Sequence, residues 1–92
     1  MSVTVRIPGP LRKISNGADK VEVESSNLAG LVAELEAQFP GMRERLIDEN
    51  GELRYFVNLY LNNEDVRFLD GLDTPLSSGD EVSIVPAVAG GS

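Results

Sequence analysis

Polar and apolar residues alternate in two stretches near the start of the chain, residues 3–7 and residues 20–24. A repeat of two is typical of strands that are buried on one face only. Between the two stretches, Asn16-Gly17 is a strong turn sequence, and residues 11–14 are a candidate for the start of the returning strand. Residues 2–24 are therefore predicted to form a first β-hairpin.

The spacing of apolar residues then changes to three and four, which predicts a helix with one apolar face. The residues on that face are Leu28, Leu31, Val32, Leu35 and Phe39. Ser25-Ser26-Asn27 offers side chains that can cap the start of this helix. Phe39-Pro40-Gly41 is expected to end it, because proline disfavours a helical residue before it. Residues 42–46 are expected to add one further turn. The apolar face is interpreted as core packing, and no cofactor site is predicted on it.

The second half of the chain is predicted to supply the rest of a sheet. Residues 54–61 have the strongest strand signal, because they are rich in aromatic and branched side chains. The later elements are expected to be a turn at Asn62-Asn63, a short strand over residues 64–68, a loop over residues 70–78 and a last strand over residues 81–85. Pro86 has no N–H to donate, so it can end the pairing of that last strand.

The order of these elements predicts an α+β fold, in which one main helix covers one face of a mixed sheet of four to five strands. The chain has 92 residues, the size of a single domain. We expect residues 1–86 to form the folded body and residues 87–92 to form a flexible tail. No apolar run approaches the ~18 residues needed to span a bilayer. The first residues lack the apolar core of a signal peptide, so the expected location is the cytoplasm.

The composition argues against several classes of catalyst. The chain contains no Cys, no His and no Trp. Disulfides, thiolate metal sites and cysteine nucleophiles are therefore excluded. The usual general base near neutral pH is missing as well. We expect a binding or carrier protein rather than an enzyme, without a metal site or a bound cofactor.

The net charge of −7 disfavours nucleic acid as a partner, because phosphates are bound by Lys and Arg. It fits a partner with a basic docking surface, and it fits solubility equally well. The acidic residues near turns are Glu64, Asp65, Asp80 and Glu81. They could pair with basic groups of a partner, although such residues more often only solvate a turn. The arginines at 43, 45, 54 and 67 are scattered along the sequence, and no role is predicted for them.

The tail that follows the last strand is small and poor in side chains. Residues 87–91 read Ala-Val-Ala-Gly-Gly. Glycine has no Cβ, so a Gly-Gly end fits a slot that is too narrow for other residues. Such a tail can offer a terminal carboxylate, and we expect the carboxyl carbon of Gly91 to be the reactive atom. A plain alternative is that Gly-Gly-Ser is a flexible end without function.

Two segments resemble the ubiquitin-like β-grasp sulfur carriers of the MoaD/ThiS family. Residues 56–68 (FVNLYLNNEDVRF) resemble the family's central strand and turn, and residues 76–91 (LSSGDEVSIVPAVAGG) resemble its C-terminal signature. Gly-Gly alone would be a weak signal, but its position after Gly-Asp-Glu-Val, an apolar strand and a proline is fairly specific. The resemblance covers essentially the whole chain, and it is strongest to the carriers of bacterial cysteine biosynthesis.

The resemblance implies a role for Gly91 as the site of covalent attachment. An E1-like adenylyltransferase would use ATP to adenylate its carboxyl group, and a sulfur donor would then leave a thiocarboxylate. A PLP-dependent cysteine synthase would accept the sulfur, and a zinc metalloprotease would free the product. Ser92 departs from the family pattern, so either a protease removes it first or it is foreign to the native chain.

The tail is expected to enter a partner's channel as an extended strand. Its residues are Ala87, Val88, Ala89 and Gly90, and with Gly91 they reach roughly 17 Å. Val85 and Pro86 are predicted to dock partners, although Val85 could simply belong to the core. An exposed patch of Phe56, Tyr60 and Phe68 is a further candidate, but core or sheet packing is favoured for each of them.

Several functions share this tail chemistry. A small subunit of molybdopterin synthase or a thiamin sulfur carrier would need the same reactive end. A protein modifier would instead be joined to lysines through Gly91. A β-grasp interaction module with an inert tail is the remaining alternative, in which the loss of residues 90–92 would change nothing.

Overall fold

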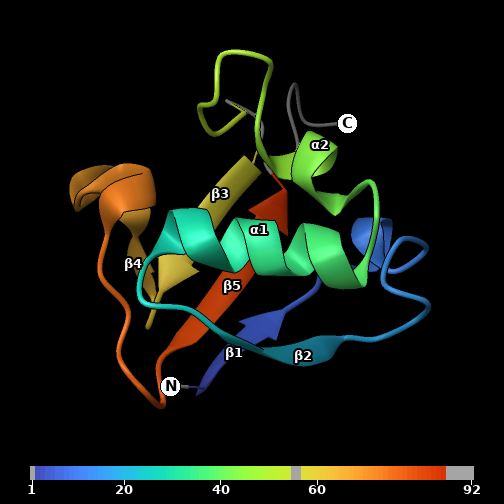
Figure 1. Cartoon of the computed structure of the whole chain (residues 1–92), viewed down its shortest axis with the longest axis horizontal. Helices are drawn as coiled ribbons and strands as arrows, with labels where there is room; N and C mark the ends of the chain where they lie inside the picture. The colour runs from blue at the N-terminus through green and yellow to red at the C-terminus, as the bar shows by residue number, and fades with distance from the viewer. Residues whose placement is uncertain (1, 55–56, 87–92) are drawn as a thin grey trace.

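The protein folds as a mixed sheet with one long helix lying across one face (Figure 1). The computed structural model describes residues 2–54 and 57–86. Its strands are β1 (Ser2–Arg6), β2 (Lys20–Glu24), β3 (Val57–Leu61), β4 (Glu64–Asp65) and β5 (Glu81–Pro86). Its helices are α1 (Leu28–Gln38) and α2 (Met42–Leu46), with short 3₁₀ turns η1 (Gly9–Leu11), η2 (Val66–Phe68) and η3 (Gly71–Asp73). The predicted α+β class is confirmed.

The strand order in the sheet is β2-β1-β5-β3-β4. β5 runs parallel to β1 and antiparallel to β3, so the last strand of the chain lies in the middle of the sheet. β1 and β2 form the predicted first hairpin, with Val3 opposite Val23. Strands that are far apart in sequence therefore meet at the centre, where β1 and β5 pair through Val5 and Val82.

Local signals set the limits of α1 as the sequence predicts. The Asn27 side chain accepts a hydrogen bond from the backbone N–H of Gly30 at 2.8 Å, which caps the start of the helix. The backbone N–H of Phe39 bonds the Leu35 carbonyl at 2.7 Å, and Pro40 follows. Gly41 has a φ of 101°, a left-handed conformation suited to glycine, and α2 begins directly after it.

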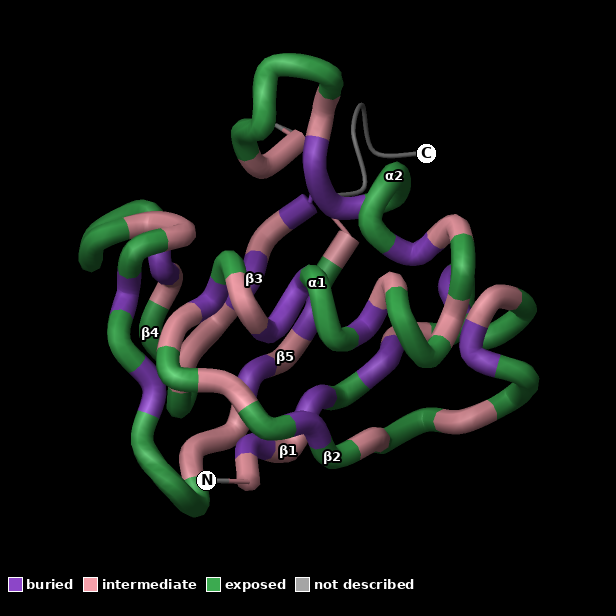
Figure 2. Tube along the Cα trace, in the orientation of Figure 1, coloured by how far each residue is buried: buried purple, intermediate pink, exposed green. Residues whose placement is uncertain are grey.

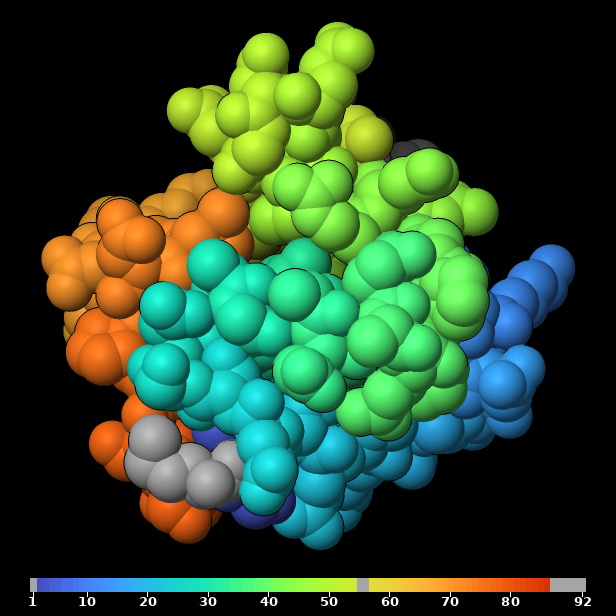
Figure 3. Space-filling model, in the orientation of Figure 1, coloured from blue at the N-terminus to red at the C-terminus, as the bar shows by residue number. Residues whose placement is uncertain are grey.

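The core lies between α1 and the sheet. Along β1, β3 and β5 buried residues alternate mostly with half-buried ones (Figure 2), and the buried residues of α1 belong to the same core cluster as those of the strands. Leu28, Leu31 and Leu35 of α1 have no exposed surface, and Leu59 of β3 is likewise fully buried. The space-filling view shows α1 covering this face, while the loop that follows α2 projects beyond the rest of the body (Figure 3). The predicted use of the apolar helix face for core packing is confirmed.

One predicted strand is absent, and another is shorter than predicted. Residues 11–14 do not begin a return strand, because η1 is followed there by hydrogen-bonded turns, with the Ile14 N–H bonding the Leu11 carbonyl at 3.1 Å. Pro10 lies within η1 and favours this helical turn, since its ring presets φ. The predicted strand over residues 64–68 stops at Asp65, whose carboxylate accepts from the Arg67 backbone N–H at 2.8 Å and starts η2 instead.

The remaining differences lie at element boundaries. β3 begins at Val57, so Arg54, the first residue of the predicted strand, lies outside the observed one, and residues 55–56 are not described. The predicted loop over residues 70–78 contains η3. The Asn62-Asn63 turn is confirmed, with φ values of 50° and 74° that suit asparagine. Pro86 is still a member of the ladder, opposite Val57, and β5 ends with it.

Candidate functional site

The predicted reactive residue, Gly91, and the predicted channel residues Ala87, Val88, Ala89 and Gly90 lie outside the described residues. The structure shows instead where the chain leaves the sheet. β5, which lies between β1 and β3 in the strand order, ends at Pro86 opposite Val57 of β3. Any group carried by the residues that follow is therefore attached to the middle of the sheet rather than to an edge.

Val85 and Pro86, the predicted docking residues, lie at this exit. Val85 is 41% exposed and stands opposite Asn58 of β3. Pro86 stands opposite Val57, which is 4% exposed. Because side chains alternate along a strand, Val85 and Asn58 face the side of the sheet away from α1. The alternative that Val85 belongs to the core is wrong.

Arg67, to which the sequence assigns no role, is fixed beside the same exit. Its Nη2 donates to the Val57 carbonyl at 2.8 Å and to the Arg54 carbonyl at 2.9 Å, and its Nη1 donates to the Asn58 side-chain oxygen. These contacts tie η2 to the beginning of β3. We call Asn58, Arg67, Val85 and Pro86 the tail-exit corner. No motif could have revealed it, because the acceptors are mostly backbone atoms distant in sequence.

The two described members of the candidate aromatic patch differ in exposure. Phe68 of η2 is 83% exposed, so the packing favoured for it is wrong. Tyr60 of β3 is half-buried, and Phe56 lies outside the described residues. Leu69, next to Phe68, is 37% exposed. Phe68 and Leu69 therefore form a small apolar tip on η2.

Three of the four acidic residues near turns make contacts within the protein. The Asp80 side chain accepts from the Asn62 amide at 3.1 Å and from the Ser77 backbone N–H at 2.8 Å. Glu81 forms an ion pair with Arg6 at 2.9 Å, and the hydrogen bond and the charge of Glu81 raise the pKa of Arg6. Asp65 starts η2 as described above. Glu64 is exposed. Contacts within the protein thus account for three of these four residues, and two of them, Asp65 and Asp80, hold turns.

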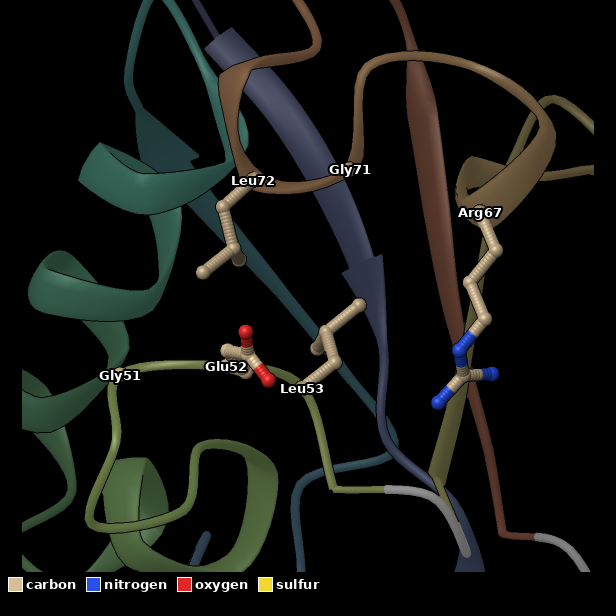
Figure 4. A pocket seen from close by; sticks show the side chains of 6 residues that line it. All are labelled: Gly51, Glu52, Leu53, Arg67, Gly71 and Leu72. Atoms are coloured by element: carbon tan, nitrogen blue, oxygen red, sulfur yellow. The ribbon is translucent and has the colours of Figure 1, made fainter.

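A shallow pocket lies between the loop after α2 and the η2–η3 segment (Figure 4). The residues that line it are Gly51, Glu52, Leu53, Arg67, Gly71 and Leu72. The close-up shows Leu53 and Leu72 approaching each other across the pocket, with Arg67 at one side. The lining offers one carboxylate and one guanidinium, and the guanidinium is already bound to β3. No group of three or more acidic, His or Cys side chains within residues 2–54 and 57–86 could hold a metal ion.

The sequence match to a known family extends across this corner and the tail. The model of the ThiS family matches residues 5–91, which include Gly91 and end one residue before Ser92. The chain belongs to the ThiS family. In this ThiS-family protein the predicted resemblance is thereby confirmed, and the family match covers the tail-exit corner as well as the Gly-Gly end.

Named relatives share the full length of this ThiS-family chain. The sulfur carrier protein CysO of Mycobacterium tuberculosis is 47% identical over 93 residues, which cover 99% of this chain and 100% of the relative. The crystal structure of Mycobacterium tuberculosis CysO has a TM-score of 0.89 at 45% identity, covering 94% of this chain and 99% of that chain. A chain in the crystal structure of the Amycolatopsis orientalis BexX/CysO complex has a TM-score of 0.91 at 40% identity, covering 96% of this chain and 98% of that chain. The ubiquitin-like β-grasp fold is confirmed.

The helices of this ThiS-family protein are short, with 11 residues in α1 and five in α2. None of those in the described part of the chain is both long enough and apolar enough to span a membrane.

Proposed function

We propose that this protein is a sulfur carrier, a substrate of partner enzymes rather than an enzyme itself. The observation that carries the proposal is the full-length match to a relative named as a sulfur carrier, together with a family match that runs through Gly91. The position of β5 supports it, because the proposed tail follows a strand inside the sheet and not a loop. We further propose that residues 1–86 form the body and residues 87–92 a flexible tail.

The chemistry proposed for Gly91 proceeds in two steps. A free carboxylate is a poor electrophile and is ionised at neutral pH. An E1-like adenylyltransferase would transfer AMP from ATP to this carboxylate and release pyrophosphate. A sulfur donor would then attack the acyl carbon and expel AMP, which leaves a thiocarboxylate. An amide bond to Ser92 blocks the first step, so whatever follows Gly91 must be removed before activation.

The partners follow from this sequence of reactions. We propose the E1-like adenylyltransferase as the activating partner and a PLP-dependent cysteine synthase as the sulfur acceptor, with cysteine or a related metabolite as product. A zinc metalloprotease would trim Ser92 or release the product. ATP and the sulfur donor are used by the partner enzymes, and the carrier itself would bind no cofactor. We propose a cytoplasmic location for the whole set.

The partner would hold the tail in a narrow channel. Ala87, Val88, Ala89 and Gly90 would line up as an extended strand that brings Gly91 to the partner's active site. Val85 and Pro86 would rest against the channel's mouth. The exposure of Val85 supports this arrangement, because an apolar side chain is available at the exit.

The proposal is tested by the intact mass of a chain ending at Gly91. This chain is incubated with ATP, a sulfide source and the activating enzyme of its own organism. The expected result is a mass increase equal to the exchange of one oxygen for one sulfur. The chain that retains Ser92 is the matched control, and it should stay unchanged unless a protease is added. Failure of the trimmed chain to gain sulfur in the presence of active enzyme would contradict the proposal.

Two further experiments separate the alternatives. Lysines of other proteins that carry residues 68–91 of this chain after tryptic digestion of host extracts would indicate a protein modifier, because Arg67 is the last trypsin site before Gly91. Sulfur transfer from the charged chain to a molybdopterin or thiazole precursor, but not to a cysteine precursor, would place the carrier in one of those syntheses.

A further inference from the structure

Arg67 carries a charge that the described residues leave unbalanced. Arginine has five N–H donors. Three of them bind neutral acceptors, namely the carbonyls of Arg54 and Val57 and the side-chain oxygen of Asn58. No carboxylate within residues 2–54 and 57–86 forms an ion pair with Arg67. The Nε–H and one Nη1–H therefore remain available on an exposed side chain.

The position of this guanidinium is set by the sheet. Its acceptors lie at the beginning of β3, opposite the end of β5. Asn58 is the direct cross-strand partner of Val85, and directly opposed residues have Cβ atoms about 5 Å apart. Asn58 thus stands between a fixed cation and an exposed apolar side chain. All three lie next to Pro86, where the predicted tail begins.

We propose that the tail-exit corner is a docking surface that receives an Asp or Glu carboxylate of the activating enzyme on Arg67. An apolar side chain of the same enzyme would pack on Val85. This inference rests on the proposed function, since it assigns the partner that handles the tail.

Charge complementarity selects this occupant. The chain as a whole has a net charge of −7, which favours basic partner surfaces. Arg67 is a local exception at the tail exit, where its cation calls for an anionic group. Its guanidinium is already held in place, so docking costs little side-chain entropy. A carboxylate is the natural acceptor for guanidinium donors. The corner would in this way set the orientation in which the partner engages the chain.

The test is the steady-state activation of chains ending at Gly91, followed as ATP–pyrophosphate exchange by the activating enzyme of the same organism. Arg67→Gln should raise the KM for the carrier about tenfold and leave kcat nearly unchanged, because the lost contact is made on docking. Arg67→Lys keeps the charge but loses the planar guanidinium. Its KM should therefore lie between those of the wild type and Arg67→Gln. Lys13→Gln is the matched control, because this substitution changes the net charge by the same amount. Lys13 is exposed and has no side-chain partner in the described part of the chain.

Two results separate docking from a structural role. Urea unfolding of each variant shows whether the KM was measured on folded protein. In the wild-type chain, the Nε–H resonance of Arg67 should shift when the enzyme is titrated in, and this readout needs no variant. An unchanged KM for folded Arg67→Gln, or a resonance that does not respond to the enzyme, would overturn the proposal. Self-association of the wild-type chain through Arg67 would overturn it too, since the occupant would then be a second copy.

The docking proposal for the tail-exit corner and the proposed function can fail separately. If the wild-type chain gains sulfur while Arg67 variants keep a normal KM, the corner proposal alone fails. If the trimmed wild-type chain is not activated at any concentration, the proposed function fails first.

Discussion

Asn62 and Glu81 exchange two hydrogen bonds across the end of the β3–β5 ladder. The Asn62 backbone N–H donates to the Glu81 carbonyl at 2.8 Å, and the Glu81 backbone N–H donates to the Asn62 side-chain oxygen at 3.0 Å. The Asn62 amide also donates to the Asp80 carboxylate at 3.1 Å. Asn62 thus joins the tight turn after β3 to the start of the strand that leads to the tail.

Replacing Asn62 by glycine should remove these side-chain bonds and keep the turn. Glycine accepts the φ of 50° without strain. Asn63 has a φ of 74° in the same turn and no side-chain partner in the described residues, so Asn63→Gly is a matched control for the added chain entropy. In urea unfolding, Asn62→Gly should lose about 1 kcal/mol more than Asn63→Gly. Equal losses would show that the side-chain bonds of Asn62 contribute nothing.

Glu36 should make stability depend on pH. The backbone N–H of Arg43 donates to its carboxylate at 2.9 Å, and the Gly41 N–H donates as well. The Arg43 bond, followed by the Gly41 bond, lowers the pKa of Glu36 below its ordinary value of 4.5. Because the folded pKa is depressed, the stabilisation is present above the unfolded pKa and is lost as the pH falls through the folded pKa.

The variant Glu36→Gln should therefore melt at a lower temperature than the wild type at about pH 7, and the difference should shrink towards about pH 3. Glu34→Gln is the control, because Glu34 is exposed on the same helix and has no partner in the described residues. The measurement is the melting temperature of the wild type, Glu36→Gln and Glu34→Gln between about pH 3 and about pH 7. A difference for Glu36→Gln that stays constant with pH would contradict the assignment.

Gly30 should resist a substitution that usually stabilises helices. Alanine in place of a helical glycine commonly gains up to about 1 kcal/mol. Here a Cβ on Gly30 would lie 2.5 Å from the Ser25 hydroxyl oxygen and 3.2 Å from the Asn27 side-chain oxygen that caps α1. The alanine must therefore displace part of the cap. We expect Gly30→Ala to lower the free energy of unfolding.

In a Ser25→Ala background, Gly30→Ala should instead raise the free energy of unfolding, because the closest clash is then absent. A double-mutant cycle of urea unfolding measures the coupling, expected at about 1 kcal/mol. Additive effects of the two substitutions would mean that Ser25 moves aside at no cost.

The tail glycines should matter for activation and not for folding. A Cβ at residue 90 would obstruct a narrow channel, so Gly90→Ala should slow sulfur loading at least about tenfold. Its melting temperature should equal that of the wild type. Ala89→Gly removes a Cβ from the neighbouring position and should be loaded normally. Wild-type loading of both Gly90→Ala and Gly91→Ala would disprove the channel.

Most of the fold could be predicted because its signals are local. The apolar spacing of α1, its Asn27 cap and the stop at Pro40 all lie within one short segment. The turn at Asn62-Asn63 is set by residues that tolerate positive φ. Alternation predicts β1, β2 and β5 for the same reason. Each of these features is determined by residues that are neighbours in the sequence.

What could not be predicted depends on contacts between distant segments. The place of β5 beside β1 joins the two ends of the described chain, and no local pattern encodes such a pairing. η2 replaces the second half of a predicted strand because the Asp65 side chain caps it. Arg67 acts on acceptors 9 to 13 residues away, two of which are backbone carbonyls. Residue type alone does not distinguish it from the other arginines.

The central position of β5 has a mechanical consequence. A pull on the residues beyond Pro86 is first carried by the pairs of Ile84, Val85 and Pro86 with β3, because the ladder between β5 and β1 spans only Glu81, Val82 and Ser83. Further separation of β5 would then have to break the pairs of Val82 and Ser83 with both neighbouring strands. In the proposed carrier, two neighbouring strands would thus hold the first half of β5 against traction on the terminus.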